Sequence, residues 1–247
     1  MRNLNYRKMW SVVVLLLFIL CSPIQVMAAT ITEVVDVEGF DRIFVLSPYD
    51  VEIVRGAEFH VEVTVDRKHE DAIDVWVDNS ALILGVGSGP YNFSTLKARV
   101  TLPLLDSVEI LGAGNASLSG FTQYRLAVRI VGTGRIRGSA LWIDELDLKV
   151  IGTGGVDFGG IGPLQYADVG LDGVNESTLN MAEGSMIKAA MLGITRLKDW
   201  GSDVHLDVTK IGFSQVKWLG DSPGVQGLPP IGPGHTGSWY ASEQSGH

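Results

Sequence analysis

The residue types that most often carry out catalysis or bind metal ions are few in this chain and widely separated. Its five histidines include no pair three or four residues apart, the spacing at which two histidines commonly ligate one metal ion. Cys21 is the single cysteine. No Gly-x-Ser-x-Gly segment stands between a strand pattern and a helix pattern, where a serine nucleophile would need it. The sequence therefore predicts no metal site, no cofactor and no catalytic residue.

Aromatic and cationic side chains are the remaining candidates for a binding site. Trp142 and Trp200 could stack on sugar rings if they point outward, whereas the phase of Trp218 predicts that it faces the core. Arg129 and Lys149 could contact a polymer if the fold brings one above the other. Except for Trp218, these residues make up the predicted binding site, which depends on the elements that position them.

Glycines recur about every 20 residues through the second half of the chain. Four and two residues before each glycine the side chains are almost always apolar, and after it polar and apolar positions alternate. Alternation on both sides of a glycine indicates two short strands joined by a sharp bend, which glycine permits because it has no Cβ. These turn glycines are Gly112, Gly132, Gly152, Gly173, Gly193 and Gly212.

A unit repeated at this period predicts an all-β fold, a right-handed parallel β-helix with coils of about 20 residues. Rows of Val, Ile and Leu would then stack into a continuous core, and each coil would pair with its neighbours. Arg129 and Lys149 would share one outer row with Glu109, and Arg137 would stack with Asp157. A β-sandwich with regularly spaced strands is the alternative fold, and it requires hairpin turns instead of a fixed phase.

Residues 1–28 have the pattern of a secretory signal peptide. Three basic residues precede an apolar run, and the Val-Met-Ala sequence that ends at Ala28 fits a cleavage site. The apolar run is shorter than the roughly 20 residues that span a membrane. The mature protein is therefore expected to be exported to the periplasm, the outer surface or the medium, with no transmembrane segment after cleavage.

The mature chain divides by composition into three parts. Residues 29–105 alternate polar and apolar side chains between turn residues, which predicts an N-terminal β-rich part that covers the first coil. The β-helix repeats occupy 106–219, and Lys210 and Lys217 place charge in the last coil. Residues 220–247 form a predicted Gly/Pro-rich flexible tail with two aromatic residues, Trp239 and Tyr240. The strands predicted in the N-terminal part are residues 41–47, 50–55, 59–66, 73–78, 81–86 and 96–102.

The charge of the mature chain excludes some partners. The whole sequence has a formal net charge of -9, and three of its basic residues and none of its acidic residues lie in segment 1–28, which leaves -12 on the mature chain. An acidic, glycine-rich chain without a basic patch is a poor partner for nucleic acid or for an anionic lipid surface.

The order of several short motifs resembles one family of exported bacterial proteins. Val-Glu-Gly-Phe-Asp-Arg-Ile at 37–43 leads into Asp-Val-Glu-Ile-Val-Arg-Gly at 50–56, and Val-Thr-Leu-Pro-Leu-Leu follows at 100–105. Three Gly-x-Gly segments then begin at Gly112, Gly132 and Gly152. This order, over residues 35 to 220, resembles the putative autotransporter-adhesin head domains, also called GIN domains. The resemblance implies an extracytoplasmic all-β protein with a β-helical part and, by its name, a role in adhesion.

Together these features predict an exported, non-enzymatic binding module of the cell envelope or surface, of adhesin-like character. Its expected partner is a surface glycan or an envelope protein, and nucleic acid is not expected. Two alternatives remain open at this stage because a fold does not determine a function: a β-helical polysaccharide-active enzyme, and a purely structural envelope protein.

Overall fold

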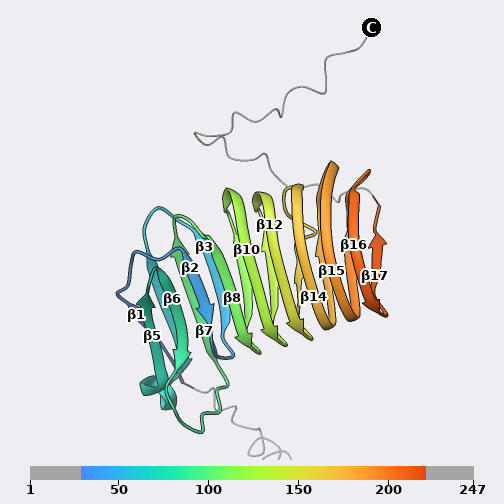
Figure 1. Ribbon diagram of the computed structural model, residues 1–247. Helices are drawn as coiled ribbons and strands as arrows, with labels where there is room; N and C mark the ends of the chain where they lie inside the picture. Colours follow the sequence, from blue (N-terminus) through green and yellow to red (C-terminus); the bar gives the residue numbers. More distant parts are fainter. Residues whose placement is uncertain (1–28, 221–247) are drawn as a thin grey trace, which may run out of the picture.

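The chain folds into a rod of stacked strands, which the computed structural model describes over residues 29–220 (Figure 1). The predicted signal peptide and nearly all of the predicted tail, with Trp239 and Tyr240, lie outside the described residues. The elements are β1 (Thr30–Val35), β2 (Arg42–Val45), β3 (Asp50–Arg55), β4 (His60–Asp66), the 3-10 helix η1 (Arg67–Ala72), β5 (Ile73–Asp78), β6 (Ala81–Val86), β7 (Leu96–Leu102), β8 (Ser107–Gly112), β9 (Asn115–Ser119), β10 (Thr122–Gly132), β11 (Arg135–Ser139), β12 (Trp142–Gly152), β13 (Gly155–Asp157), β14 (Leu164–Leu179), β15 (Met181–Asp199), β16 (His205–Gly212) and β17 (Gln215–Trp218).

The strands form two faces with the core between them. We call the first face sheet A, in the order β5–β6–β2–β8–β10–β12–β14–β15–β16. The second face, sheet B, has the order β1–β4–β7–β3–β9–β11–β13–β14–β15–β17. The long strands β14 and β15 belong to both faces because they continue through the glycine corner.

The predicted 20-residue phase is confirmed, and the fold is a parallel β-helix. Each turn glycine is the direct partner of the next one along the rod, from Gly112 to Gly212. All six have positive φ, between 91° and 133°, a region that favours glycine. The pairing of successive coils is parallel throughout, so the β-sandwich alternative is wrong.

The N-terminal part extends both sheets. β2 pairs in parallel with β8, and β3 with β9, so hydrogen bonding is continuous from this part into the coils. Antiparallel pairs then lead to the end of the rod: β4 with β7, β1 with β4, and β5 with β6. The six predicted strands are all present, with β2 and β4 slightly shorter than expected. Two further elements, β1 and η1, were not predicted from the sequence.

The last coil has no further coil stacked on it among the described residues, and this overturns the prediction for Trp218. Phe158 and Trp218 stand six residues after their turn glycines, at the same inward phase. Phe158 is 0% exposed between two coils, whereas Trp218 is 44% exposed because nothing in the described chain covers β17. Lys210 and Lys217 are exposed on the same coil, as predicted.

Candidate functional site

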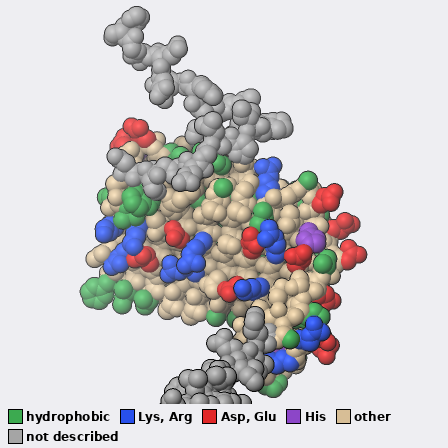
Figure 2. Space-filling model, turned by 180° about the vertical axis from the view of Figure 1, so that it is seen from behind, with side chains coloured by type: hydrophobic (Ala, Val, Ile, Leu, Met, Phe, Trp, Pro, Cys, Tyr) green, Lys and Arg blue, Asp and Glu red, His purple; other side chains and the backbone are tan. Residues whose placement is uncertain are grey.

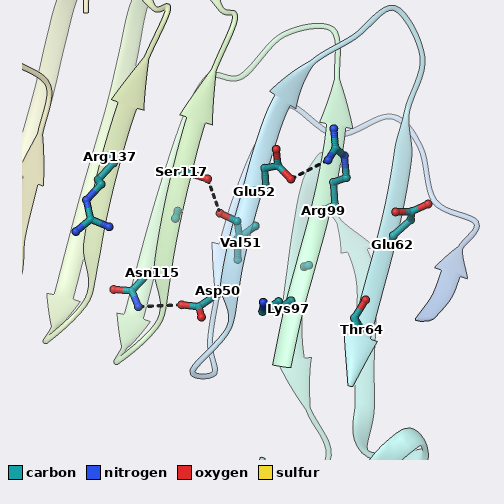
Figure 3. Close-up of a pocket in the computed structure, with 12 residues that line it drawn as sticks. Asp50, Val51, Glu52, Glu62, Thr64, Lys97, Arg99, Asn115, Ser117 and Arg137 are labelled. Carbon is teal, nitrogen blue, oxygen red and sulfur yellow. Dashed lines mark hydrogen bonds and ion pairs between the residues drawn. The ribbon is translucent and has the colours of Figure 1, made fainter. Parts of the chain in front are cut away.

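An open groove crosses the outer face of sheet B toward the N-terminal end of the rod (Figure 3). Its volume is about 540 Å³, and its walls come from the neighbouring strands β4, β7, β3, β9 and β11. Because side chains alternate between the two sides of a strand, every second residue points outward around the groove, and the nearly buried Val51, Ala98 and Ala116 between them also contact it. The lining residues are Asp50, Val51, Glu52, Glu62, Thr64, Lys97, Ala98, Arg99, Asn115, Ala116, Ser117 and Arg137.

The polar side chains of this face lie in two rows that run along the rod. The first row consists of Glu62, Arg99, Glu52, Ser117, Arg137, Asp157, Thr178, Lys198 and Lys217. The second row, two residues away on every strand, consists of Thr64, Lys97, Asp50, Asn115, Arg135, Gly155, Glu176, Arg196 and Gln215. With strands about 4.8 Å apart, each row is about 38 Å long.

Polar contacts between neighbouring strands fix several of these side chains (Figure 3). Arg99 Nη1 lies 2.9 Å from Glu52 Oε2, an ion pair between two half-exposed side chains. Asn115 donates from Nδ2 to Asp50 Oδ1 at 2.9 Å. Exposed ion pairs of this kind contribute less than about 1 kcal/mol to stability. They orient the side chains and leave them able to form hydrogen bonds with a ligand.

A second groove of about 410 Å³ continues the face toward the C-terminal end. Arg135, Glu176 and Arg196, which follow one another along the second row, line its charged side. Arg196 Nη1 lies 2.9 Å from Glu176 Oε2, and Lys198 Nζ also hydrogen-bonds to that carboxylate. The hydrogen bond from Lys198, followed by that from Arg196, holds the pKa of Glu176 below its usual value. Glu176 is therefore ionised at neutral pH and shared between two cations.

An apolar ridge borders this second groove. Val174, Ile194 and Phe213 directly follow the turn glycine in three successive coils, and they are 53%, 57% and 81% exposed. Figure 2, which shows the molecule from behind the view of Figure 1, has hydrophobic side chains gathered at the corner of the rod that carries β17. The same figure shows Lys and Arg side chains in separate groups along the face, with acidic side chains between them. The second groove therefore has one charged wall and one apolar wall.

The structure places the binding residues predicted from the sequence in two separate regions, both away from these grooves. Arg129 and Lys149 are partners on sheet A, as predicted, and Arg129 Nη1 lies 3.7 Å from Glu109 Oε2. Trp142 begins β12 and Trp200 follows β15, at the corner opposite the turn glycines. Lys149 follows Trp142 by seven residues on one strand, about 23 Å of extended chain. One compact ligand cannot contact all four.

Both tryptophans are half-buried against glycines of the loop after β13. A Cβ added at Gly162 would lie 2.4 Å from Cε3 of Trp142, and one at Gly159 would lie 2.9 Å from Nε1 of Trp200. Part of each indole ring therefore packs on backbone. Their role in binding, like that of Arg129 and Lys149, stays a prediction.

Most of the charged residues of the grooves were not predicted from the sequence. The stacking of Arg137 with Asp157 was the exception. The repeat alignment does contain a signal, since basic residues stand three and five positions after the turn glycine in two coils. These residues are Arg135, Arg137, Arg196 and Lys198. Lys97 and Arg99 precede the first repeat, so no periodic spacing relates them to the others.

The arrangement on sheet B is suited to binding. Within residues 29–220, no group of three or more His, Cys, Asp or Glu side chains is placed to hold a metal ion. The carboxylates of the two rows can accept hydrogen bonds from an extended ligand, and the neighbouring Lys, Arg and Asn side chains can donate them. All of these groups are held on rigid strands. No helix in the described part of the chain is long and apolar enough to cross a membrane.

Comparison with known proteins identifies relatives of this chain. A family model described as putative auto-transporter adhesin, head GIN domain, matches residues 39–197. A solved structure of a putative adhesin from Bacteroides fragilis NCTC 9343 is similar, with a TM-score of 0.67 and 20% identity over 78% of this chain and 98% of that one. A putative lipid binding protein from Parabacteroides distasonis ATCC 8503 gives a TM-score of 0.53 and 15% identity over 77% of this chain and 96% of that one. No match was found among curated proteins.

Proposed function

The chain belongs to the head GIN domain family of putative auto-transporter adhesins, and on this premise we propose that it is an exported, non-enzymatic binding module of the cell envelope or cell surface. The signal-peptide pattern of residues 1–28 supports export to the periplasm, the outer surface or the medium. The solved relatives named above share the fold at 20% identity or less, so they support the architecture and leave the ligand open.

The observation that carries this proposal is the groove of about 540 Å³ on sheet B. Five strands supply side chains that can accept and donate hydrogen bonds, and the strands belong to a continuous sheet, so the site is preorganised. A rigid, regular face of this kind suits an extended polymer or a flat protein surface. The expected partner is a surface glycan or an envelope protein.

The proposal is tested by measuring binding of purified residues 29–247 to a glycan array and to cell-envelope fractions. Specific retention on one glycan class or one envelope fraction is the expected result. Trp142→Ala and Trp200→Ala, run in parallel, examine the alternative face predicted from the sequence. If the protein is retained by neither the glycans nor the envelope fractions, the binding function is wrong and a purely structural role is favoured.

A further inference from the structure

Six cations on sheet B form three pairs at equal intervals along the rod. Each pair occupies one strand, with its two members two residues apart and thus about 7 Å from one another. The strands are β7, β11 and β15, and both intervals contain two intervening strands, which makes each interval about 14 Å. The pairs are Lys97 with Arg99, Arg135 with Arg137, and Arg196 with Lys198.

The charge of this face differs in sign from that of the whole protein. Between β7 and β15 the two rows hold six cations and four acids, a net charge of +2, on a chain whose formal net charge is -9. The acids are Asp50, Glu52, Asp157 and Glu176. The fold therefore assembles a basic patch that the sequence did not predict, and this patch can attract a polyanion that the rest of the surface repels.

Half of these cations are not neutralised within the protein. Arg99 pairs with Glu52, and Arg196 and Lys198 share one carboxylate. In residues 29–220, Lys97, Arg135 and Arg137 form no ion pair. The central pair, on β11, is entirely free of acidic partners, although the first row places Asp157 next to Arg137.

The central pair also joins the two grooves. Arg137 lines the groove of about 540 Å³, and Arg135 lines the groove of about 410 Å³. The two grooves therefore adjoin at β11, and we call the two together the trough; the central cation pair lies between them, and the other two pairs lie farther along the rod on either side. Gly155 follows Arg135 in the second row, so no side chain blocks the trough there.

We propose that this trough binds a linear anionic polysaccharide laid along the rod, across the strands. The cation pairs hold its carboxylate or sulfate groups, and a chain must span about 29 Å to reach all three pairs. The apolar ridge adds a contact specific to sugars, because the exposed ring of Phe213 can pack against the C–H faces of a sugar ring. This inference rests on the proposed binding function and names the ligand class.

The test compares three polymers by titration calorimetry: polygalacturonate, which carries carboxylates, dextran sulfate, which carries sulfate esters, and neutral dextran. We expect binding of one or both anionic polymers and none of dextran. Preference for polygalacturonate identifies uronate carboxylates as the ligand groups, and preference for dextran sulfate identifies sulfate esters. Affinity should fall more than about tenfold between 50 and 500 mM NaCl, because the contacts are ionic and exposed. It should also rise with chain length until the polymer spans the trough.

The double variant Arg135→Ala/Arg137→Ala should weaken binding at least tenfold. Its matched control is Arg125→Ala/Lys188→Ala, which removes the same charge from exposed positions on sheet A and should leave affinity nearly unchanged. Both pairs are exposed, so circular dichroism should show folded protein in each case. An equal loss in both double variants would show that only net charge matters and would overturn the proposal.

Phe213→Ala should weaken polysaccharide binding several-fold without changing the melting temperature, since the ring is 81% exposed. If this variant binds normally and polyphosphate binds as well as polygalacturonate, the trough recognises charge alone and the assignment to polysaccharide is wrong. Binding to envelope fractions without binding to either anionic polymer would overturn this inference and leave the proposed function intact. Absence of binding in every arm would overturn both.

Discussion

Gly132 and Gly112 lie in contact as partners in neighbouring coils, and a Cβ on Gly132 would be 2.2 Å from the carbonyl oxygen of Gly112. The φ of Gly132 is 133°, which L side chains rarely adopt. The same close approach recurs at every later turn glycine. The corner of each coil is therefore built on the corner of the coil before it.

Gly132→Val should destabilise the protein by more than about 3 kcal/mol, because it adds both a backbone clash and a strained φ. Urea unfolding followed by circular dichroism measures the loss. Gly160→Ala is the control, since a Cβ there would meet no atom within 4 Å. A neutral Gly132→Val variant would mean that the glycine corners are not in contact.

Phe158 and Trp218 occupy equivalent positions, six residues after a turn glycine, in a middle coil and in the last coil. The variants Phe158→Ala and Trp218→Ala therefore show how much stability depends on a further stacked coil. Removing the fully buried Phe158 ring should cost about 3–5 kcal/mol, the usual range for a buried aromatic residue. Trp218→Ala should lower the free energy of unfolding much less, because Trp218 is 44% exposed. Thermal melts of the two variants decide the matter. Equal losses would indicate that something covers the end of the rod in solution.

Tyr49→Phe tests a buried hydrogen bond in the N-terminal part. The Tyr49 hydroxyl donates to the carbonyl oxygen of Gly85 at 2.8 Å, and burial, followed by the charge of Asp74, raises the pKa of the phenol. Loss of the hydroxyl leaves that oxygen without its partner and should cost about 1–2 kcal/mol in chemical denaturation. Tyr124→Phe, at a 64% exposed position, should have no measurable effect.

Asp199 should make stability depend on pH. Its side chain is 0% exposed, Oδ1 accepts a hydrogen bond from the backbone N–H of Met181, and burial raises the pKa of the carboxyl group. Protons are therefore bound more tightly in the folded state, so this contribution is fully present below the unfolded-state pKa and is lost as pH rises through the folded-state pKa.

Asp199→Asn removes this titration. Relative to the native protein, the variant should gain stability as pH rises above the unfolded-state pKa of Asp, about 3.9, and urea unfolding at several pH values measures the gain. If the difference between the two proteins is the same at every pH, Asp199 has an ordinary pKa in the fold.

Turnover assays distinguish a binding module from a polysaccharide-active enzyme. Incubation with the anionic polymers named above should release no reducing ends and no unsaturated products. Turnover that Arg129→Ala or Lys149→Ala abolishes would instead establish the enzyme alternative and place its site on sheet A. Both side chains are exposed, so neither substitution should affect folding.

The sequence by itself determined the repeating unit and its register. Turn glycines and apolar positions recur at a fixed phase, because a stacked coil leaves no room for a Cβ at the corner and buries mostly apolar side chains inside. The strands of the N-terminal part were equally predictable, since one face of each is buried against the core and the other is exposed to solvent. Local periodicity is sufficient to predict a strand and its buried face wherever burial determines the residue type.

Tertiary structure alone decided which outward side chains meet. Packing of the core determines only that a given side chain points outward. The charge of that side chain therefore says nothing about which other side chains lie next to it. Lys97 comes into line with Arg135 because β3 inserts between β7 and β9, a pairing of segments far apart in the chain. Trp218 follows the inward pattern and is still exposed, because burial depends on whether another coil follows. The trough on sheet B depends on strand order, and strand order arises from long-range pairing that no local spacing records.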